Sequence, residues 1–459
     1  MTAQSSSAPE DRGVTPPLWR RYLAFLAPMI FSNFLQSVSG TVNNIYLGQM
    51  LGVKAMAAVS AFFPVLFFLI TFMIGLGSGA SVLIGQAWGA KELDRVRAIA
   101  GTTLMTGLAA GLVVAVFGGG FAEAVLIALG TPADILPSAT AYARIMLMAA
   151  PGLFAFLLVT SMLRGVGDTR TPLLTLLIST GVGLLATPAL IRGWLGLPPL
   201  GVTAGAWAAV ASFLIALGWT AHHLRRKRHA LAPDAAFQGH LRIDRALLAK
   251  VLRIGLPTGL SMMTVAIAEI SVLFLVNRFG SQATAAYGAV NQIVSYVQFP
   301  AISIAITASI LGAHAIGAGR NHTLGAIART GLLMNLVLTG SFVLAGYLFS
   351  RPVIGLFITD PVVVEMAQTL LHIMLWSSVI MGMSMVLSGL MRASGTVLVP
   401  TALSMLAIGG IQVPLAWLLS TRYGLNGIWA AYPVAFLCML AMQSAYYRLV
   451  WRQRPIRRL

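Results

Sequence analysis

Charged side chains are scarce in this sequence: Asp, Glu, Lys and Arg together make up 9% of its 459 residues. A soluble globular chain carries roughly 25% of such residues, which keep its surface in water. Hydrophobic residues reach 58%, more than a water-soluble fold of this length can enclose. The shortage of charge excludes a soluble globular protein and predicts that lipid surrounds the chain.

Several chemical motifs are also missing. The single cysteine, Cys438, excludes an internal disulfide and a cysteine-based metal cluster. There is no Walker P-loop, no HExxH motif and no Asp-rich metal-binding motif. We therefore expect neither an enzyme nor a resident metal or cofactor. The net charge of +18 lies in segments between apolar runs, so it indicates membrane topology and not a nucleic-acid partner.

Long apolar runs predict an all-α integral membrane protein. Residues 55–85 and 142–163 exceed the roughly 20 residues that a helix needs to cross a bilayer. The polar N-terminus through Pro17 lacks the features of a signal peptide, so the first apolar run is expected to remain as a membrane helix. The runs predict twelve helices, near 22–48, 55–86, 95–118, 134–165, 172–192, 201–222, 252–278, 284–313, 323–349, 362–392, 398–420 and 426–447.

Basic residues predict the orientation in the membrane. With the N-terminus in the cytoplasm, 24 Lys and Arg residues, Arg164 and Arg392 among them, fall on the cytoplasmic side. Only 6 fall on the other side, which is a strong positive-inside bias. We expect a multi-pass protein of the bacterial inner membrane with both termini in the cytoplasm. Its predicted parts are a tail (1–21), a lobe (22–222), a basic linker (223–250), a second lobe (251–448) and a basic tail (449–459).

The two predicted lobes are copies of one another. At a constant offset of 228 residues, identical residues align; examples are Leu47 and Leu275, Ser81 and Ser309, Gly89 and Gly317, and Arg164 and Arg392. Six helices in each copy return the chain to its starting side, so both copies insert with the same orientation. The repeat predicts two six-helix lobes related by a pseudo-two-fold axis along the membrane normal, an architecture typical of transporters.

Glu269 is the candidate for ion coupling. It is one of twelve acidic residues, and the other eleven lie at helix ends, in loops or in the polar N-terminus. Glu269 lies halfway between Pro257 and Phe279 in an apolar run, near the predicted bilayer midplane. A carboxylate there is costly unless it is paired or faces water, and such groups commonly bind protons or sodium. The alternative is a permanently protonated side chain bonded to a neighbouring helix.

Other polar residues within predicted helices are candidates for lining a substrate cavity: Gln36, Asn43, Asn291, Gln292, Tyr296 and His372. Gln36 and Asn43 are seven residues apart and share a helix face. Interhelical hydrogen bonds, or packing for His372, are the alternative. Soft side chains at Met381, Met383 and Met385 suit a cavity that accepts varied ligands. Gly75 and Gly79 form a GxxxG pair, which is typical of close helix packing.

The sequence resembles the multidrug and toxic compound extrusion (MATE) family over residues 20–448. The motifs are "VNNIYLGQMLGVKAMAA" and "GQAWGAKELDRVR" in the first copy, "LRGVGDTRTP" after the fourth helix, and "FGSQATAAYGAVNQI" in the second copy. The major facilitator superfamily also has two six-helix halves, but "GAKELDRVR" differs from its Gly- and Arg-rich loop.

The resemblance implies antiport, in which protons or sodium ions enter as small organic, often cationic, compounds leave. Many members carry an acidic residue in the first helix, where this sequence has Asn43; others use a glutamate in the seventh helix, which holds Glu269. Ion coupling is therefore expected in the second lobe of a monomer. The main alternative is a lipid or lipid-linked sugar flippase of related fold. We rank it second because few Lys or Arg residues lie within the predicted helices.

Overall fold

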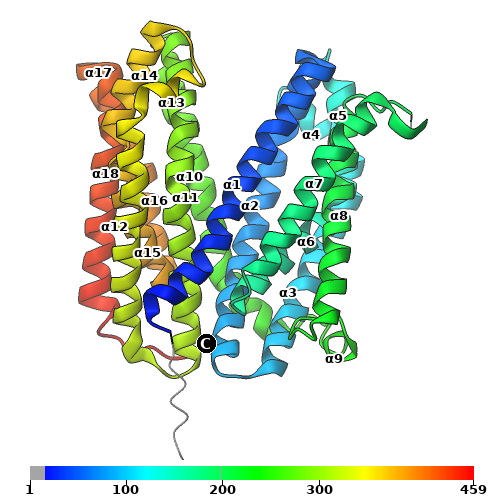
Figure 1. Cartoon of the computed structure of the whole chain (residues 1–459), viewed down its shortest axis with the longest axis vertical. Helices are drawn as coiled ribbons and strands as arrows, with labels where there is room; N and C mark the ends of the chain where they lie inside the picture. The colour runs from blue at the N-terminus through cyan, green and yellow to red at the C-terminus, as the bar shows by residue number, and fades with distance from the viewer. Residues whose placement is uncertain (1–15, 197) are drawn as a thin grey trace, which may run out of the picture.

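The computed structural model describes residues 16–196 and 198–459, which fold into helices and the segments that join them (Figure 1). The first copy of the repeat forms α1 (Leu18–Leu51), α2 (Val53–Gly89), α3 (Leu93–Val113), α4 (Gly119–Ala128), α5 (Leu136–Met148), α6 (Ala150–Gly165), α7 (Arg170–Arg192) and α8 (Thr203–Arg226). A short α9 (Ala235–Gln238) lies in the linker.

The second copy forms α10 (Arg245–Asn277), α11 (Ser281–Gly317), α12 (Leu324–Leu348), α13 (Ser350–Gly355), α14 (Pro361–Met374), α15 (Ser377–Ala393), α16 (Leu398–Met405), α17 (Val413–Tyr423) and α18 (Leu425–Tyr446). In the described part of the chain, ten helical segments are long and apolar enough to cross a membrane. The pairs α5–α6 and α14–α15, bent by 55° and 41°, supply one span each. The prediction of twelve spans is confirmed.

Two predicted helix boundaries were wrong by seven residues or more. The third span does not stop at 118, because a π turn over Val114–Gly118 joins α3 to α4 and keeps the backbone hydrogen-bonded. The seventh span begins at Arg245, seven residues before the predicted start at 252. Its N-cap is Asp244, whose carboxylate accepts hydrogen bonds from the backbone of Ala246 and Leu247.

The helices form two lobes that lean together at one end and diverge at the other (Figure 1). The first lobe contains α1–α8 and the second contains α10–α18. We call the end where the lobes meet the closed end; α9 and the C-terminus lie there. The expected arrangement of two six-helix lobes is therefore present.

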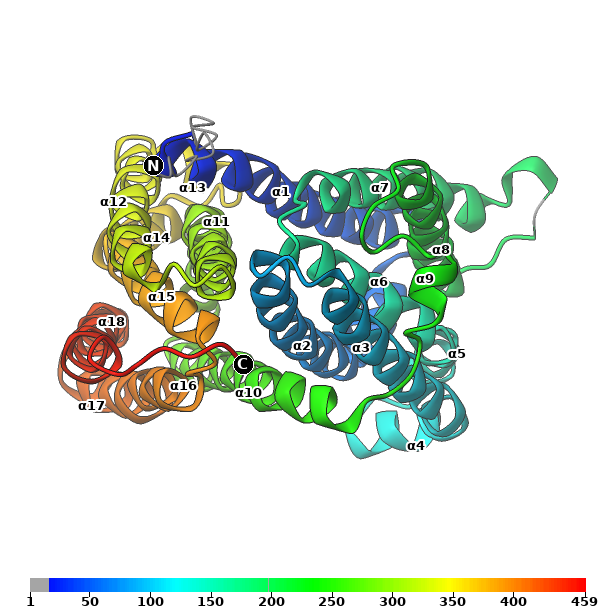
Figure 2. The same cartoon turned by 90° about the horizontal axis from the view of Figure 1, so that it is seen from below.

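Two helices cross between the lobes. Figure 2 shows α1 and α10 on opposite sides of the molecule, each running from one lobe to the other. Near the start of α1, the Tyr22 hydroxyl donates to the Ile327 carbonyl of α12 at 2.8 Å. Near the start of α10, Gly255 packs against Gly75 of α2 so closely that an added Cβ would lie 2.7 Å from the Gly75 carbonyl oxygen. Both contacts join the lobes at the closed end.

Glycines that correspond in the repeat allow α2 and α11 to touch. A Cβ at Gly89 would clash with the backbone of His314, and a Cβ at Gly317 would clash with the backbone of Gln86. Gly89 and Gly317 correspond at the offset of 228, as do Gln86 and His314. The pseudo-two-fold axis therefore passes between these two helices.

Two hydrogen bonds across the closed end are related by the same symmetry. The Gln86 side chain donates to the Ala393 carbonyl at the end of α15, at 2.7 Å. The His314 Nε2–H donates to the Gly165 carbonyl at the end of α6, at 2.8 Å. Each lobe thus caps a helix of the other lobe and satisfies a carbonyl that the helix leaves free.

The C-terminal segment, 452–459, runs from the second lobe to the first across the closed end (Figure 2). Arg458 forms an ion pair with Glu92 in the loop between α2 and α3. The backbone N–H of Leu459 donates to the Gln86 side chain at 2.9 Å. The predicted basic tail is thus folded back against the first lobe.

Candidate functional site

The carboxylate of Glu269 lies inside the second lobe, held by two tyrosines from other helices. The Tyr432 hydroxyl of α18 donates to Oε2 at 3.0 Å, and the Tyr287 hydroxyl of α11 makes a short hydrogen bond to the same oxygen. The two hydroxyl oxygens are 3.2 Å apart. The Tyr287 ring stacks on the Trp429 ring, with centroids 5.5 Å apart and planes at 6°. Buried aromatic packing therefore fixes both donors around the carboxylate.

This arrangement suits a site that exchanges small cations. Hydroxyl groups that donate to an ionised carboxylate stabilise its charge inside an apolar lobe. When a proton binds to Oε2 of Glu269, one tyrosine hydroxyl can turn and accept that proton. A sodium ion would instead find the carboxylate and the two hydroxyl oxygens of Tyr287 and Tyr432 as hard oxygen ligands. The side chain is half-buried, between the lobe interior and its surface.

At the position equivalent to Glu269 in the repeat, the first lobe has no carboxylate. The residue equivalent to Glu269 at the offset of 228 is Thr41, whose hydroxyl bonds to the Ser37 carbonyl of its own helix. The nearby Asn43 accepts a hydrogen bond from Thr187 of α7 at 3.3 Å. Asn43 thus takes part in an interhelical hydrogen bond, one of the two roles considered for it.

Of the remaining predicted residues, Asn291 lies beside the tyrosine pair, where its side chain hydrogen-bonds to Tyr287, and the others are dispersed. Gln36 is exposed on α1, and Asn291 and Gln292 are half-buried on α11. The Tyr296 ring of α11 lies 6.0 Å from the Phe34 ring of α1, where the two lobes meet. His372 is exposed on α14, and its ring lies 5.3 Å from the Tyr347 ring of α12. Their predicted roles as substrate ligands stay predictions.

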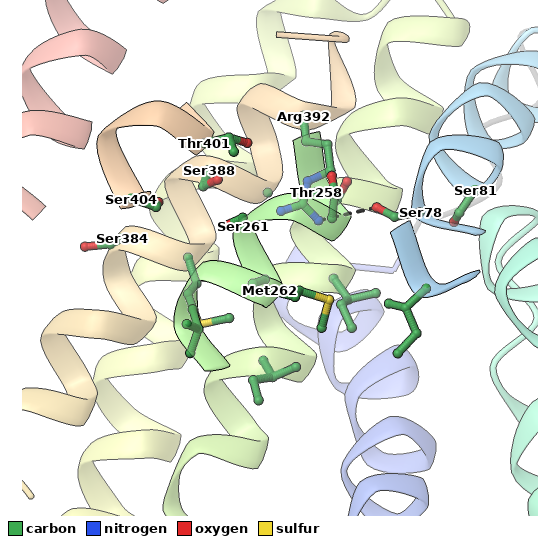
Figure 3. Close-up of a pocket in the computed structure, with 18 of the residues that line it drawn as sticks. Ser78, Ser81, Thr258, Ser261, Met262, Ser384, Ser388, Arg392, Thr401 and Ser404 are labelled. Carbon is green, nitrogen blue, oxygen red and sulfur yellow. Dashed lines mark hydrogen bonds between the residues drawn. The ribbon is translucent and has the colours of Figure 1, made fainter. Parts of the chain in front are cut away.

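A cavity of about 480 Å³ lies between the lobes. It is lined by α2 and α6 of the first lobe and mainly by α10, α11, α15 and α16 of the second (Figure 3). Its wall includes ten Ser and Thr side chains. Met381 and Met385 of the predicted methionine cluster line it, together with Met262. None of the seven predicted site residues is among the described residues that line it.

Two arginines in this wall were missed by the sequence analysis. Arg164 and Arg392 were assigned to the cytoplasmic side, but both line the cavity. They lie in the last turns of α6 and α15, where the lobes close together. Their equivalence in the repeat was a signal that could have revealed them, because equivalent positions near a two-fold axis approach each other.

Glu269 is close to the cavity along α10. Val265 and Ala266 line the cavity, and Glu269 follows them by one helical turn, about 5 Å along the axis. Glu269 therefore lies on the helix that supplies this part of the cavity wall.

Comparisons with known proteins agree with this architecture. The MatE family model matches the chain twice, over residues 28–188 and 257–418, one match in each lobe. "Probable multidrug resistance protein YoeA" of Bacillus subtilis (strain 168) is 42% identical over 446 residues, which covers 97% of this chain and 96% of that protein. "Multidrug export protein MepA" of Staphylococcus aureus (strain N315) is 22% identical over 434 residues, 94% of each protein.

A solved structure has the same fold. It is described as the outward-facing conformation of a multidrug resistance MATE family transporter of the MOP superfamily. It superposes with a TM-score of 0.86 at 21% identity, over 94% of this chain and 95% of that one. The two family matches and the 42% identity to the Bacillus subtilis protein show that the chain belongs to the MatE family of multidrug and toxic compound extrusion transporters.

Proposed function

We propose that this transporter is an antiporter that couples the entry of protons or sodium ions to the export of small organic, mainly cationic, compounds. The proposal is supported by family membership and by relatives named as multidrug resistance and multidrug export proteins. Both lobes and the cavity between them are formed by one chain, so a monomer suffices.

The positive-inside bias supports a bacterial inner-membrane protein with both termini in the cytoplasm. The closed end then faces the cytoplasm, and the lobes diverge toward the outside. In this orientation the described conformation is the one that exchanges ions and releases substrate outside. Alternating access requires a second conformation, in which the contacts of the closed end separate.

Glu269 provides the coupling step in this proposal. A cationic compound and a proton or sodium ion are both attracted by one carboxylate, so binding of the ion removes the attraction for the compound. Ion binding from outside therefore favours substrate release. After the lobes reverse, loss of the ion toward the cytoplasm restores the charge and favours reloading. Tyr287 and Tyr432 hold the carboxylate in place during both steps.

The observation that carries the proposal is the Glu269 carboxylate, held by Tyr287 and Tyr432 one turn from the cavity. The experiment is substrate uptake into inside-out vesicles driven by an imposed proton or sodium gradient. We expect Glu269→Gln to lower gradient-driven uptake at least about tenfold, because the amide keeps the size of the side chain but cannot bind and release a cation.

The matched control is Glu365→Gln, at an exposed glutamate of α14, which should transport as the unmodified protein does. If the Glu269→Gln variant accumulates substrate with unchanged ion dependence, coupling through Glu269 is wrong.

A further inference from the structure

The C-terminal segment, residues 452–459, is anchored on the second lobe. Just before it, the buried Trp451 donates a hydrogen bond from its indole nitrogen to the Ser394 hydroxyl at the end of α15, at 2.9 Å. The Asn321 side chain, in the turn between α11 and α12, donates to the Ile456 carbonyl at 2.9 Å. The Ile456 side chain packs against the apolar cluster that contains Trp451. These contacts can persist when the two lobes move apart.

The far end of the same segment bonds to the first lobe. The Arg458 guanidinium forks onto the Glu92 carboxylate: one nitrogen donates to Oε1 at 2.6 Å, and the other makes a short hydrogen bond to Oε2. Arg95 of α3 donates to the main-chain oxygen of Leu459. The Leu459 side chain packs against an apolar cluster formed mainly by the first lobe. Eight residues thus bridge the gap from one lobe to the other.

Gln86 connects the segment to a contact that holds the closed end together. Its amide nitrogen donates to the Ala393 carbonyl of the second lobe at 2.7 Å. Its amide oxygen accepts a hydrogen bond from the backbone N–H of Leu459 at 2.9 Å. Because an amide is planar, the bond from Leu459 fixes the orientation in which Gln86 presents its N–H to the other lobe. The segment therefore supports a contact between the lobes in addition to bridging them.

We propose that the C-terminal segment is a strap that holds the lobes together at the closed end and leaves the first lobe each time the lobes separate there. Its two sets of contacts are fixed to different lobes, so a larger distance between the lobes must break one set. The set on the first lobe is the one that breaks. The side chains of Arg458 and Glu92 are 27% and 44% exposed, so water can replace their bonds, whereas Trp451 is buried and follows directly on α18. The strap thereby favours the described conformation over the alternative one.

This inference rests on the alternating access of the proposed function, and it does not depend on ion coupling at Glu269. None of the residues 452–459 is among those that line the cavity. Changes in the strap should therefore alter the equilibrium between the two conformations without altering the groups that face a substrate. Glu269→Gln leaves the strap contacts intact, so a failure of the strap and a failure of the coupling step appear in different variants.

The first test measures the distance between the lobes at the closed end. Spin labels on Arg226→Cys, at the end of α8, and on Arg329→Cys, in α12, report this distance by double electron–electron resonance in liposomes. Both positions are exposed, and Cys438 is replaced by Ser in the full chain that carries the labels. The quantity compared is the ratio of separated to closed molecules.

Loss of the ion pair should shift this ratio. We expect Arg458→Ala to raise it about two- to fivefold, which is the usual effect of a partly exposed ion pair. Exchange of the charges, Glu92→Arg together with Arg458→Glu, should bring the ratio back toward that of the unmodified protein. Arg454→Ala, at an exposed arginine of the same segment, is the matched control and should leave the ratio unchanged. An unchanged ratio in Arg458→Ala would show that the segment does not hold the lobes together.

Crosslinking tests whether the strap must leave the first lobe. Glu92→Cys with Arg458→Cys, again with Cys438 replaced by Ser, is treated with a bis-maleimide whose spacer contains a disulfide. We expect the crosslinked molecules to stop transporting substrate into inside-out vesicles, because alternating access requires the lobes to separate at this end. Transport should return when a reductant cleaves the spacer.

The matched control crosslinks the strap to its own lobe. Asn321→Cys with Ile456→Cys joins two positions that are in contact within the second lobe, so it should transport equally with and without the spacer. Equal transport before and after cleavage of the Glu92→Cys and Arg458→Cys crosslink would overturn the proposal, since the segment could then remain on the first lobe throughout the cycle.

Discussion

At the scale of residues, the two lobes are alike in backbone and different in chemistry. The carboxylate of Glu269 and its partners Tyr287 and Tyr432 belong to the second lobe. At the equivalent place in the first lobe, Thr41 bonds only to its own helix. A single carboxylate in one lobe makes ion binding asymmetric, whereas the arginines at the cavity, one from each lobe, remain symmetric.

The ion pair of Glu92 and Arg458 gives the C-terminal segment a predictable dependence on pH. The hydrogen bond from Arg458, followed by the charges of Arg458 and Arg95, lowers the pKa of Glu92 from 4.5. A carboxyl group whose folded pKa is lowered stabilises the contact above its unfolded pKa and loses this stabilisation as pH falls through the folded pKa. The ion pair should therefore help to hold the segment at neutral pH and lose this stabilisation in acid, below the ordinary pKa of a glutamate.

A spin label on Ile456→Cys, with Cys438 replaced by Ser, measures this docking. We expect the mobility of the label to be low at neutral pH and higher in acid. In the Arg458→Ala variant the mobility should be high at both pH values. The neighbouring Arg457→Ala, which alters an exposed arginine, should behave as the parent does. A label with equal mobility at neutral and acid pH would contradict the account.

The site was only partly predictable from the sequence. Glu269 was identifiable because an ionisable residue in a long apolar run is unusual. Its partners Tyr287 and Tyr432 were not, because they come from two other helices whose rotation about their axes is set by packing. Arg164 and Arg392 were placed at helix ends, and sequence alone did not reveal that the cavity reaches these ends.

At the scale of elements, the closed end depends on helices that touch at glycines. The predicted pair Gly75 and Gly79 of α2 packs on α10: a Cβ at Gly75 would lie 2.6 Å from the Gly255 carbonyl oxygen, and one at Gly79 would clash with the Val251 carbonyl. The absence of side chains lets the two backbones approach, as in other close helix pairs in membranes. These contacts join the first lobe to the second.

A larger residue at this contact should open the closed end. We expect Gly79→Leu to oppose the described conformation by about 1–3 kcal/mol, the usual cost of overpacking. A cysteine introduced near the Gly89–His314 contact should then react faster with a water-soluble thiol reagent, and export should fall. Gly181→Leu on α7, where an added Cβ meets nothing within 4 Å, is the control. Unchanged reactivity and export in Gly79→Leu would show that this contact does not hold the lobes together.

Helix number and order were predictable because lipid requires long, continuously hydrogen-bonded apolar segments. The two errors in the predicted helix boundaries have local causes. The third predicted helix ended at 118, but a π turn over Val114–Gly118 leads directly into α4, which begins with Gly119 and Gly120. The start of α10 was predicted too late because its first turns carry basic residues and do not resemble an apolar run. In the sequence, the N-cap residue Asp244 is the signal for this start.

At the scale of the whole molecule, the repeat of 228 residues predicted two lobes related by a pseudo-two-fold axis, and the matched contacts of Gly89 and Gly317 confirm this relation. The angle between the lobes could not be predicted. A repeat specifies that the two halves are alike, but the free-energy difference between conformations depends on contacts spread over both lobes. The described state, closed at one end, is one member of the pair that alternating access requires.

The central claim is that ion entry at Glu269 and substrate export are one coupled process. The most direct measurement is ion flux into proteoliposomes, with proton and sodium gradients imposed one at a time and with substrate present or absent. We predict that substrate stimulates the flux of one of these cations, and that Glu269→Gln abolishes the stimulation while Glu365→Gln retains it. Substrate-stimulated flux that persists in Glu269→Gln, or export without flux of either cation, would contradict the account.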